Sequence, residues 1–162
     1  MPETAAPILR PADIGDAHAI AAIYAPYVRD TTVSFETEPP DAAEIVRRMS
    51  GLLPHYPYLV AERRGRVVGY AYAAPHRARA AYHTSCDVSV YIEEAAHRLG
   101  LGRLLYAELL AMLAARGFHM AFAGIALPNP ASEGLHRAMG FERVGVYREV
   151  GFKFGRFIDT VW

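Results

Sequence analysis

The segment from Arg98 to Arg103, between a predicted strand and a predicted helix, has residue types that can hold a phosphate group. Gly100 and Gly102 let the backbone approach a negative charge closely, and the first amides of a helix can donate to it. The two arginines could add charge-assisted hydrogen bonds. A glycine-bearing loop before a helix is more often a tight turn, and the complete nucleotide P-loop and dinucleotide fingerprints are absent. From the residues alone, a turn and an anion site both remain open.

A second group of polar side chains lies around a predicted strand over residues 84–92. Its possible metal ligands have spacings that match none of the usual zinc patterns: His76, His83, Cys86 and His97. We therefore expect no metal. The residues alone favour interpreting Asp87 as a strand-end carboxylate that pairs with a nearby arginine.

The patterns around these residues predict a mixed sheet covered by helices, an α/β (α+β) arrangement. Strands are expected over 8–10, 58–63, 67–75, 84–92 and 118–126, from Gly140, and within 151–162. Helices are expected from Asp13 to a break or kink at Pro26, from Asp41 to Pro54, over 101–116, and from Pro130 after an Asn129 cap. The long helix over 101–116 would make one parallel crossover.

Length and charge narrow the class of protein. A chain of 162 residues predicts one domain over 1–162. Its 17 basic and 17 acidic residues balance, so we expect neither nucleic acid nor a membrane as a partner. Cys86 is the only cysteine, and residues 1–7 have no apolar core of signal-peptide length. These features favour a cytoplasmic protein.

Two motifs resemble those of the GNAT superfamily of N-acetyltransferases. His97–Gly102 resembles the acyl-CoA-binding motif Gln/Arg-x-x-Gly-x-Gly/Ala, with histidine in the first position. Leu127–Ser132 and Leu135–Phe141 resemble the second motif. Within the superfamily, the chain is most similar to phosphinothricin and methionine sulfoximine acetyltransferases. That likeness is carried by Thr31–Phe35, Tyr70–Ala73, Arg77–Tyr82, Ser89–Ile92, Gly124–Asn129 and Gly151–Lys153. The resemblance implies the GNAT fold, a mixed central sheet with helices on both faces and a splayed strand pair for acyl-CoA.

The resemblance also implies acetyl-CoA as the co-substrate. Its pyrophosphate is expected at the glycine loop, and its pantetheine arm along the free edge of the strand that contains Ser89–Ile92. The matching positions are Val90, Ile92, His97, Arg98, Leu99, Gly100, Leu101, Gly102, Arg103, Asn129 and Ser132. A helix-capping role explains Asn129 equally well.

Direct attack of an amine on the thioester is the chemistry that the resemblance implies, and it needs a base to take a proton from the amine. The general-base glutamate of the family aligns with Asp87, which is shorter by one methylene, so a water could bridge the added distance. His136 stands where many members have a tyrosine that protonates the leaving thiolate. It could do that work, or it could be a hydrogen-bonded histidine on a half-buried helix face.

Five residues match the substrate-binding positions of the subgroup: Phe35, Arg77, Arg79, Tyr82 and Lys153. Arginine forks and a tyrosine hydroxyl suit carboxylate, phosphinate or sulfoximine-like oxygens, and a phenylalanine can form an apolar wall. Without the resemblance, a solvated basic turn and a core phenylalanine would explain the same residue types. Phe154 stands where the subgroup often has histidine.

We therefore expect an acetyl-CoA-dependent N-acetyltransferase for a small amino-acid-like amine of the phosphinothricin, methionine sulfoximine or methionine sulfone class. The alternatives are a GNAT enzyme for a polyamine, an aminoglycoside or a protein N-terminus, and a CoA-binding protein without catalysis. Arg77 and Arg79 would repel polyamines. We also expect a homodimer, with a final strand that is short or completed by the partner. The aromatic residues near the end suit such an interface or a core: Phe152, Phe154, Phe157 and Trp162.

Overall fold

The computed structural model describes residues 6–162. Residues 1–5, which belong to the segment where no signal peptide is expected, lie outside this range. The central sheet has the strand order β1-β2-β3-β4-β5. Its strands are β1 (Ile8–Pro11), β2 (Tyr58–Arg63), β3 (Arg66–Pro75), β4 (Ser85–Ile92) and β5 (Met120–Phe122). Neighbours pair antiparallel except β4 and β5, which are parallel. A second sheet has the order β6 (Ile125–Ala126), β8 (Arg156–Val161) and β7 (Val146–Lys153).

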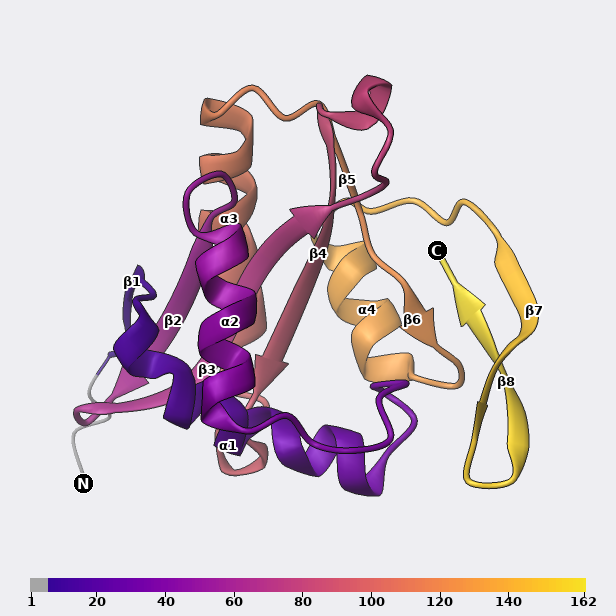
Figure 1. Cartoon of the computed structure of the whole chain (residues 1–162), viewed down its shortest axis with the longest axis horizontal. Coiled ribbons are helices and arrows are strands. Elements are labelled where there is room, and N and C mark those ends of the chain that lie inside the picture. Colours follow the sequence, from indigo (N-terminus) through magenta and orange to yellow (C-terminus); the bar gives the residue numbers. More distant parts are fainter. Residues whose placement is uncertain (1–5) are drawn as a thin grey trace.

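Helices cover both faces of the central sheet. They are α1 (Ala17–Asp30), α2 (Ala42–Leu52), α3 (Leu101–Ala115) and α4 (Pro130–Ala138), with the short 3₁₀ turns η1 (Ile14–Asp16), η2 (Ala80–Tyr82) and η3 (Glu94–Ala96). Figure 1 shows α2 in front of the sheet and α3 behind it. Alternate residues of β2 explain this layering, because Tyr58 and Val60 are buried with α1 and α2, while Leu59 and Ala61 are buried with α3. The predicted mixed sheet with helices on both faces is confirmed.

Local capping bonds set the starts of the helices. Asp13 accepts a hydrogen bond from the Gly15 amide, and the Asp16 carboxylate accepts one from the Asp13 amide, which makes the capping box before α1. The Asp41 side chain accepts a hydrogen bond from the third residue of α2, as predicted. The Asn129 side chain caps α4 in the same way, with Pro130 in the first turn.

Three predicted boundaries are wrong. The break expected at Pro26 is not present: α1 continues through it, because proline removes only one backbone donor and the buried side chains of Ile23 and Val28 hold the helix on both sides of it. The strand expected over 118–126 is divided into β5 and β6, which belong to different sheets. The strand expected from Gly140 starts only at Val146, since Gly140 has a φ of +86° and ends α4 instead.

Within residues 6–162, no helix is both long enough and apolar enough to cross a bilayer.

Candidate active site

Strands β4 and β5 separate directly after Asp87. The last of their three paired positions joins Asp87 to Phe122, and the chain then leaves to form β6, which pairs with β8. From Val88 to Ile92, β4 is paired with β3 on one side and has no strand from residues 6–162 on the other. Figure 1 shows β4 and β6 diverging from this point. The predicted splayed strand pair is confirmed, and its free edge can hydrogen-bond an extended ligand.

The loop before α3 leaves the first amides of that helix without a side-chain cap. Gly100 precedes the helix with a φ of +78°, a left-handed conformation that glycine adopts without strain. Gly102 has another reason to be glycine, because a Cβ there would lie 3.1 Å from Cδ2 of Leu135 on α4. Arg98 and Arg103 are exposed on either side. The uncapped amides and the positive end of the helix dipole suit a phosphate group.

The imidazole of His97 is held against the end of β4 and against α1. Its Nε2 lies 2.9 Å from the carbonyl oxygen of Ile92 and 2.9 Å from Oη of Tyr27. Tyr27 also donates a hydrogen bond to the Ile92 carbonyl, at 2.5 Å. The ring therefore ties the glycine loop to the end of β4, a role that the sequence did not indicate.

The carboxylate of Asp87 pairs with a histidine, not with the arginine expected from the residues alone. Its Oδ1 lies 2.5 Å from Nδ1 of His76. Burial raises the pKa of Asp87, while the hydrogen bond to His76 and the charges of His76 and Arg77 lower it in part. A carboxylate with a raised pKa, placed where two strands separate, is a candidate base.

Aromatic rings from three other segments surround His76. The imidazole stacks on Phe122 with ring centroids 4.4 Å apart, and it meets Tyr82 and Trp162 edge-on at 5.8 and 6.4 Å. Sequence reasoning considered His76 only as a metal ligand, and among residues 6–162 no three His, Cys, Asp or Glu side chains gather to hold a metal ion. Its place beside Asp87 follows from the antiparallel register of β3 and β4, which the sequence pattern did not specify.

His136 uses both ring nitrogens within the protein. Nδ1 donates to the Ser132 carbonyl at 2.7 Å, and Nε2 lies 3.0 Å from the Tyr106 hydroxyl, which must then be the donor. Burial lowers the pKa of His136, so the ring is favoured in its neutral form. The backbone N–H of Ser132 in turn donates a hydrogen bond to Oδ1 of Asn129 as part of the helix cap. Of the two interpretations that the sequence left open, these contacts support the hydrogen-bonded histidine.

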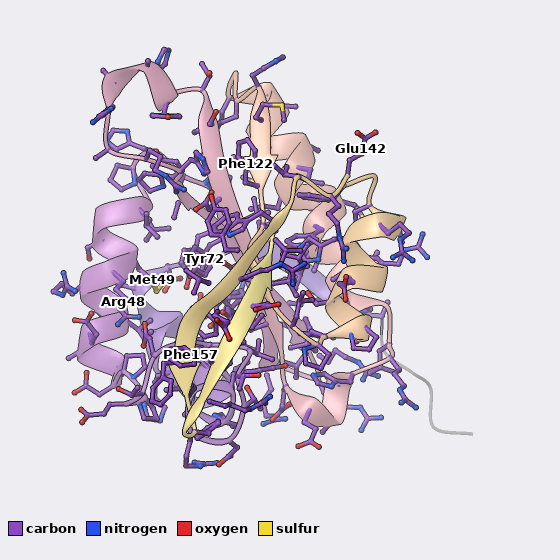
Figure 2. All side chains as sticks on the ribbon, turned by 90° about the vertical axis from the view of Figure 1, so that its right-hand side faces the viewer. Arg48, Met49, Tyr72, Phe122, Glu142 and Phe157 are labelled. Carbon is purple, nitrogen blue, oxygen red and sulfur yellow. The ribbon has the colours of Figure 1, made fainter. Side chains whose placement is uncertain are left out.

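A cavity of about 500 Å³ lies beside these groups, between β5, α4 and the end of β8. Phe122, His136 and Trp162 line this cavity. The residues predicted to bind the acceptor and the residues of the glycine loop do not line it. Figure 2 shows Phe122 near the upper end of the β7–β8 hairpin, which crosses in front of the central sheet. The cavity therefore adjoins the aromatic side of the His76 ring.

Arg77, Arg79 and Tyr82 lie together on the connection between β3 and β4. All three are exposed, and neither guanidinium forms an ion pair with a carboxylate of residues 6–162. Arg77 donates only to the carbonyl of His76, at 2.7 Å. The positive charges of this connection are thus available to an anionic group close to Asp87.

Phe35 lies in the segment between α1 and α2 and packs on β7. A Cβ at Gly151 would come within 2.5 Å of the Phe35 ring, so the ring occupies the space above that glycine. The ring remains 42% exposed, which leaves an apolar surface free. The expected apolar wall is compatible with this position.

The ammonium of Lys153, the only lysine of the chain, is buried. It donates hydrogen bonds of 2.6, 2.8 and 2.8 Å to the carbonyls of Val28, Thr31 and Ser34. These bonds use its three donors, so the side chain supports the segment that carries Phe35 instead of reaching a bound acceptor. Burial lowers the pKa of this ammonium, and its place at the C-terminal end of α1 is favourable for a cation.

The sequence matches the family described as the acetyltransferase (GNAT) domain over residues 9–162. Among curated proteins, phosphinothricin N-acetyltransferase of Streptomyces coelicolor is 44% identical, covering 100% of this chain and 97% of that protein. The L-methionine sulfoximine/L-methionine sulfone acetyltransferase of Pseudomonas paraeruginosa is 36% identical, covering 95% and 91%.

Solved structures are similar over nearly the whole chain. A GNAT superfamily phosphinothricin acetyltransferase from Sinorhizobium meliloti, in complex with AcCoA, has a TM-score of 0.92 and 39% identity, covering 96% of this chain and 85% of that one. A ribosomal-protein-alanine N-acetyltransferase from Brucella melitensis has a TM-score of 0.92 and 37% identity, covering 95% and 96%. The splayed strands, the glycine loop and these similarities agree: the chain belongs to the GNAT family of acetyltransferases.

Proposed function

We propose that this chain transfers the acetyl group of acetyl-CoA to the amine of a small amino-acid-like acceptor of the phosphinothricin, methionine sulfoximine or methionine sulfone class. The observation that carries the proposal is the position of Asp87, where β4 and β5 part, next to a connection that bears two unpaired arginines. The names of two similar proteins support the same acceptor class. The family match over residues 9–162 supports a single N-acetyltransferase domain.

Acetyl-CoA would lie in the fork between β4 and β6. The pantetheine arm would pair with the free edge of β4 at Val90 and Ile92, and the pyrophosphate would bind the amides of residues 98–103. Arg98 and Arg103 would add charge-assisted bonds. Asn129 and Ser132 would then border the arm from the start of α4, in addition to their capping bond.

In this proposal the acceptor amine attacks the carbonyl carbon of the thioester. A C–N bond forms, the base assembly at Asp87 takes a proton from the nitrogen, and the C–S bond breaks. The CoA thiolate then takes up a proton. We assign no proton transfer to His136, because both of its ring nitrogens are already hydrogen-bonded.

The acidic end of the acceptor would be held by Arg77, Arg79 and Tyr82, with Phe35 as the apolar wall. Two guanidinium groups without carboxylate partners favour a carboxylate, phosphinate or sulfoximine-like group and disfavour a polyamine. Lys153 contributes by fixing the segment of Phe35, not by touching the acceptor.

The test is thiol release from acetyl-CoA with phosphinothricin, methionine sulfoximine, methionine sulfone, spermidine and an N-terminal alanine peptide as separate acceptors. Turnover confined to the first three, and lost with Arg79→Gln, would support the acceptor class. Turnover with the peptide would favour a protein acceptor, in line with the name ribosomal-protein-alanine N-acetyltransferase of the Brucella melitensis protein. Acetyl-CoA binding without turnover on any acceptor would favour a binding protein.

The same proposal includes a homodimer in the cytoplasm. The β7–β8 hairpin exposes apolar side chains that a partner could cover, namely Tyr147, Val150, Phe152, Phe154 and Phe157. The single cysteine is a buried free thiol, as suits a reducing compartment.

A further inference from the structure

The carboxylate at position 87 is one methylene shorter than the glutamate expected in the family, and a histidine ring lies against it. The Asp87 Oδ1 to His76 Nδ1 distance of 2.5 Å makes this a charge-assisted hydrogen bond. The ring carries a second nitrogen, so a proton acceptor other than the carboxylate lies beside Asp87. The missing methylene and the added imidazole therefore bear on the same proton transfer.

The surroundings of His76 fix the ring without using its second nitrogen. Phe122 stacks on the ring, and Tyr82 and Trp162 lie in T-shaped arrangements with it. The His76 side chain is only 13% exposed. Its Nε2 forms no hydrogen bond within residues 6–162, and this nitrogen is not fully buried. A fixed ring with one nitrogen on a carboxylate and the other free has the arrangement of a positioned general base.

We propose that His76 is the general base of the acetyl transfer and that Asp87 is its positioning residue. Asp87 holds the proton of His76 on Nδ1, which leaves the lone pair of Nε2 toward the acceptor. This inference rests on the proposed acetyltransferase function and names the group that receives the proton.

The lone pair of the acceptor amine forms the C–N bond to the thioester carbonyl carbon, and Nε2 of His76 takes a proton from that nitrogen. The imidazolium is stabilised by the Asp87 carboxylate, as in other histidine–carboxylate pairs. The carbonyl then re-forms as the C–S bond breaks, and the imidazolium gives its proton to the leaving thiolate, directly or through a water, which returns His76 to its neutral form.

The groups that face the His76 ring come from several elements of the fold. They are Asp87 from β4, Tyr82 from η2 and the neighbouring Arg77, while β5 and β8 contribute only Phe122 and Trp162. The charged group in direct contact with the ring is therefore the Asp87 carboxylate.

The first experiment compares His76→Phe with wild type, using an acceptor that wild type acetylates. Phenylalanine keeps the stack on Phe122 and removes both nitrogens, so kcat should fall about 10²-fold or more while the Kd for acetyl-CoA is unchanged. The matched control is His83→Phe, an exposed histidine of the same connection that bonds only the carbonyl of Ala80, and it should keep wild-type kcat. If His76→Phe keeps kcat within about 3-fold and Asp87→Asn loses it, Asp87 acts directly and the proposal is overturned.

Two rescue measurements separate a chemical role from a structural one. Added imidazole should restore part of the kcat of His76→Ala, more strongly at higher pH, because free imidazole base replaces the missing ring. The double variant His76→Phe with Asp87→Glu should also regain activity relative to His76→Phe, because the longer carboxylate reaches the amine. Absence of both rescues would overturn the assignment of His76 as the base.

The pair can also be tested without turnover. A low-field proton resonance from His76 Nδ1 should be present in wild type and lost in Asp87→Asn and in His76→Phe. If this resonance is present while no acceptor is acetylated, the proposed function fails and the pair stands. If acceptors are acetylated while the resonance is absent, the His76 inference fails and the proposed function stands.

Discussion

The ring of Phe35 occupies the space that a side chain at Gly151 would need. A Cβ at that glycine would lie 2.5 Å from Cε2 and from Cζ of the ring, well inside van der Waals contact. The missing side chain on β7 therefore lets the segment between α1 and α2 lie against the hairpin. This contact, and not the type of residue 35 alone, decides where the apolar wall of the candidate acceptor site stands.

Gly151→Ala should displace Phe35 and weaken acceptor binding. We expect the KM for the acceptor to rise by about 10-fold, since small shifts of positioning groups are costly, while the Kd for acetyl-CoA stays the same. Steady-state kinetics and calorimetry measure the two quantities. Gly145→Ala is the control, because nothing lies within 4 Å of a Cβ there. Equal KM values for the two variants would contradict the role given to Phe35.

Lys153→Met should loosen the same segment from the other side. It leaves three buried carbonyls without their donor, so the free energy of unfolding should fall by about 3 kcal/mol in urea titrations. The acceptor KM should rise as well. Arg156→Met, an exposed cation of the same hairpin, should leave both unchanged. A Lys153→Met enzyme with wild-type stability and wild-type KM would contradict the role given to the three hydrogen bonds of Lys153.

The stability of the protein should fall in mild acid partly through His136. Burial lowers the pKa of His136 below its unfolded value of about 6.5, so its contribution is present above that pH and is lost as the pH falls through the folded-state pKa. In urea titrations from about pH 8 to about pH 5, His136→Gln should lose less stability than wild type. His18→Gln, at an exposed histidine, should follow wild type. The idea fails if all three proteins share one pH dependence.

Gly100 in the glycine loop and Gly134 in α4 should respond oppositely to alanine. Gly100→Ala forces a side chain into a left-handed conformation and should destabilise the protein by about 1 kcal/mol and weaken acetyl-CoA binding. Gly134→Ala, inside α4 with nothing within 4 Å, should stabilise it by about 0.5–1 kcal/mol without changing binding. Thermal unfolding and CoA titration measure both effects, and a matching sign in the two variants would refute the backbone argument.

Phe152 and Phe157 should matter for assembly. Their rings are each 62% exposed, with centroids 5.0 Å apart on the hairpin. Figure 2 shows Phe157 near the lower end of that hairpin. The double serine variant should sediment as a monomer at concentrations where wild type sediments as a dimer, because the apolar area that a partner covers is lost. Leu104→Ser, at an exposed position of α3, should not change the mass. A monomeric wild type would remove the dimer from the proposal.

Much of the framework was predictable because it depends on neighbours in the chain. The caps at Asp13, Asp41 and Asn129 and the glycine before α3 are local signals, and each marks a helix start that the structure contains. The family motifs have the same local character, and the family match bears out the assignment made from them. The continuous apolar run Tyr58–Ala61 is likewise a local pattern, and it suits a strand that is buried on both faces.

The pairs that give the candidate site its properties come from residues far apart in the chain. Lys153 reaches carbonyls between Val28 and Ser34, and no pattern around residue 153 indicates them. His76 meets Asp87 only through the register of β3 with β4. The separation of β5 from β6 likewise depends on a distant segment, because β6 pairs with β8. The sequence alone determined the family and most of the elements, since propensity and capping act over a few residues, but it did not divide β5 from β6. The tertiary structure decided which side chains share a proton or a donor, because strand register and helix packing are set by the whole core.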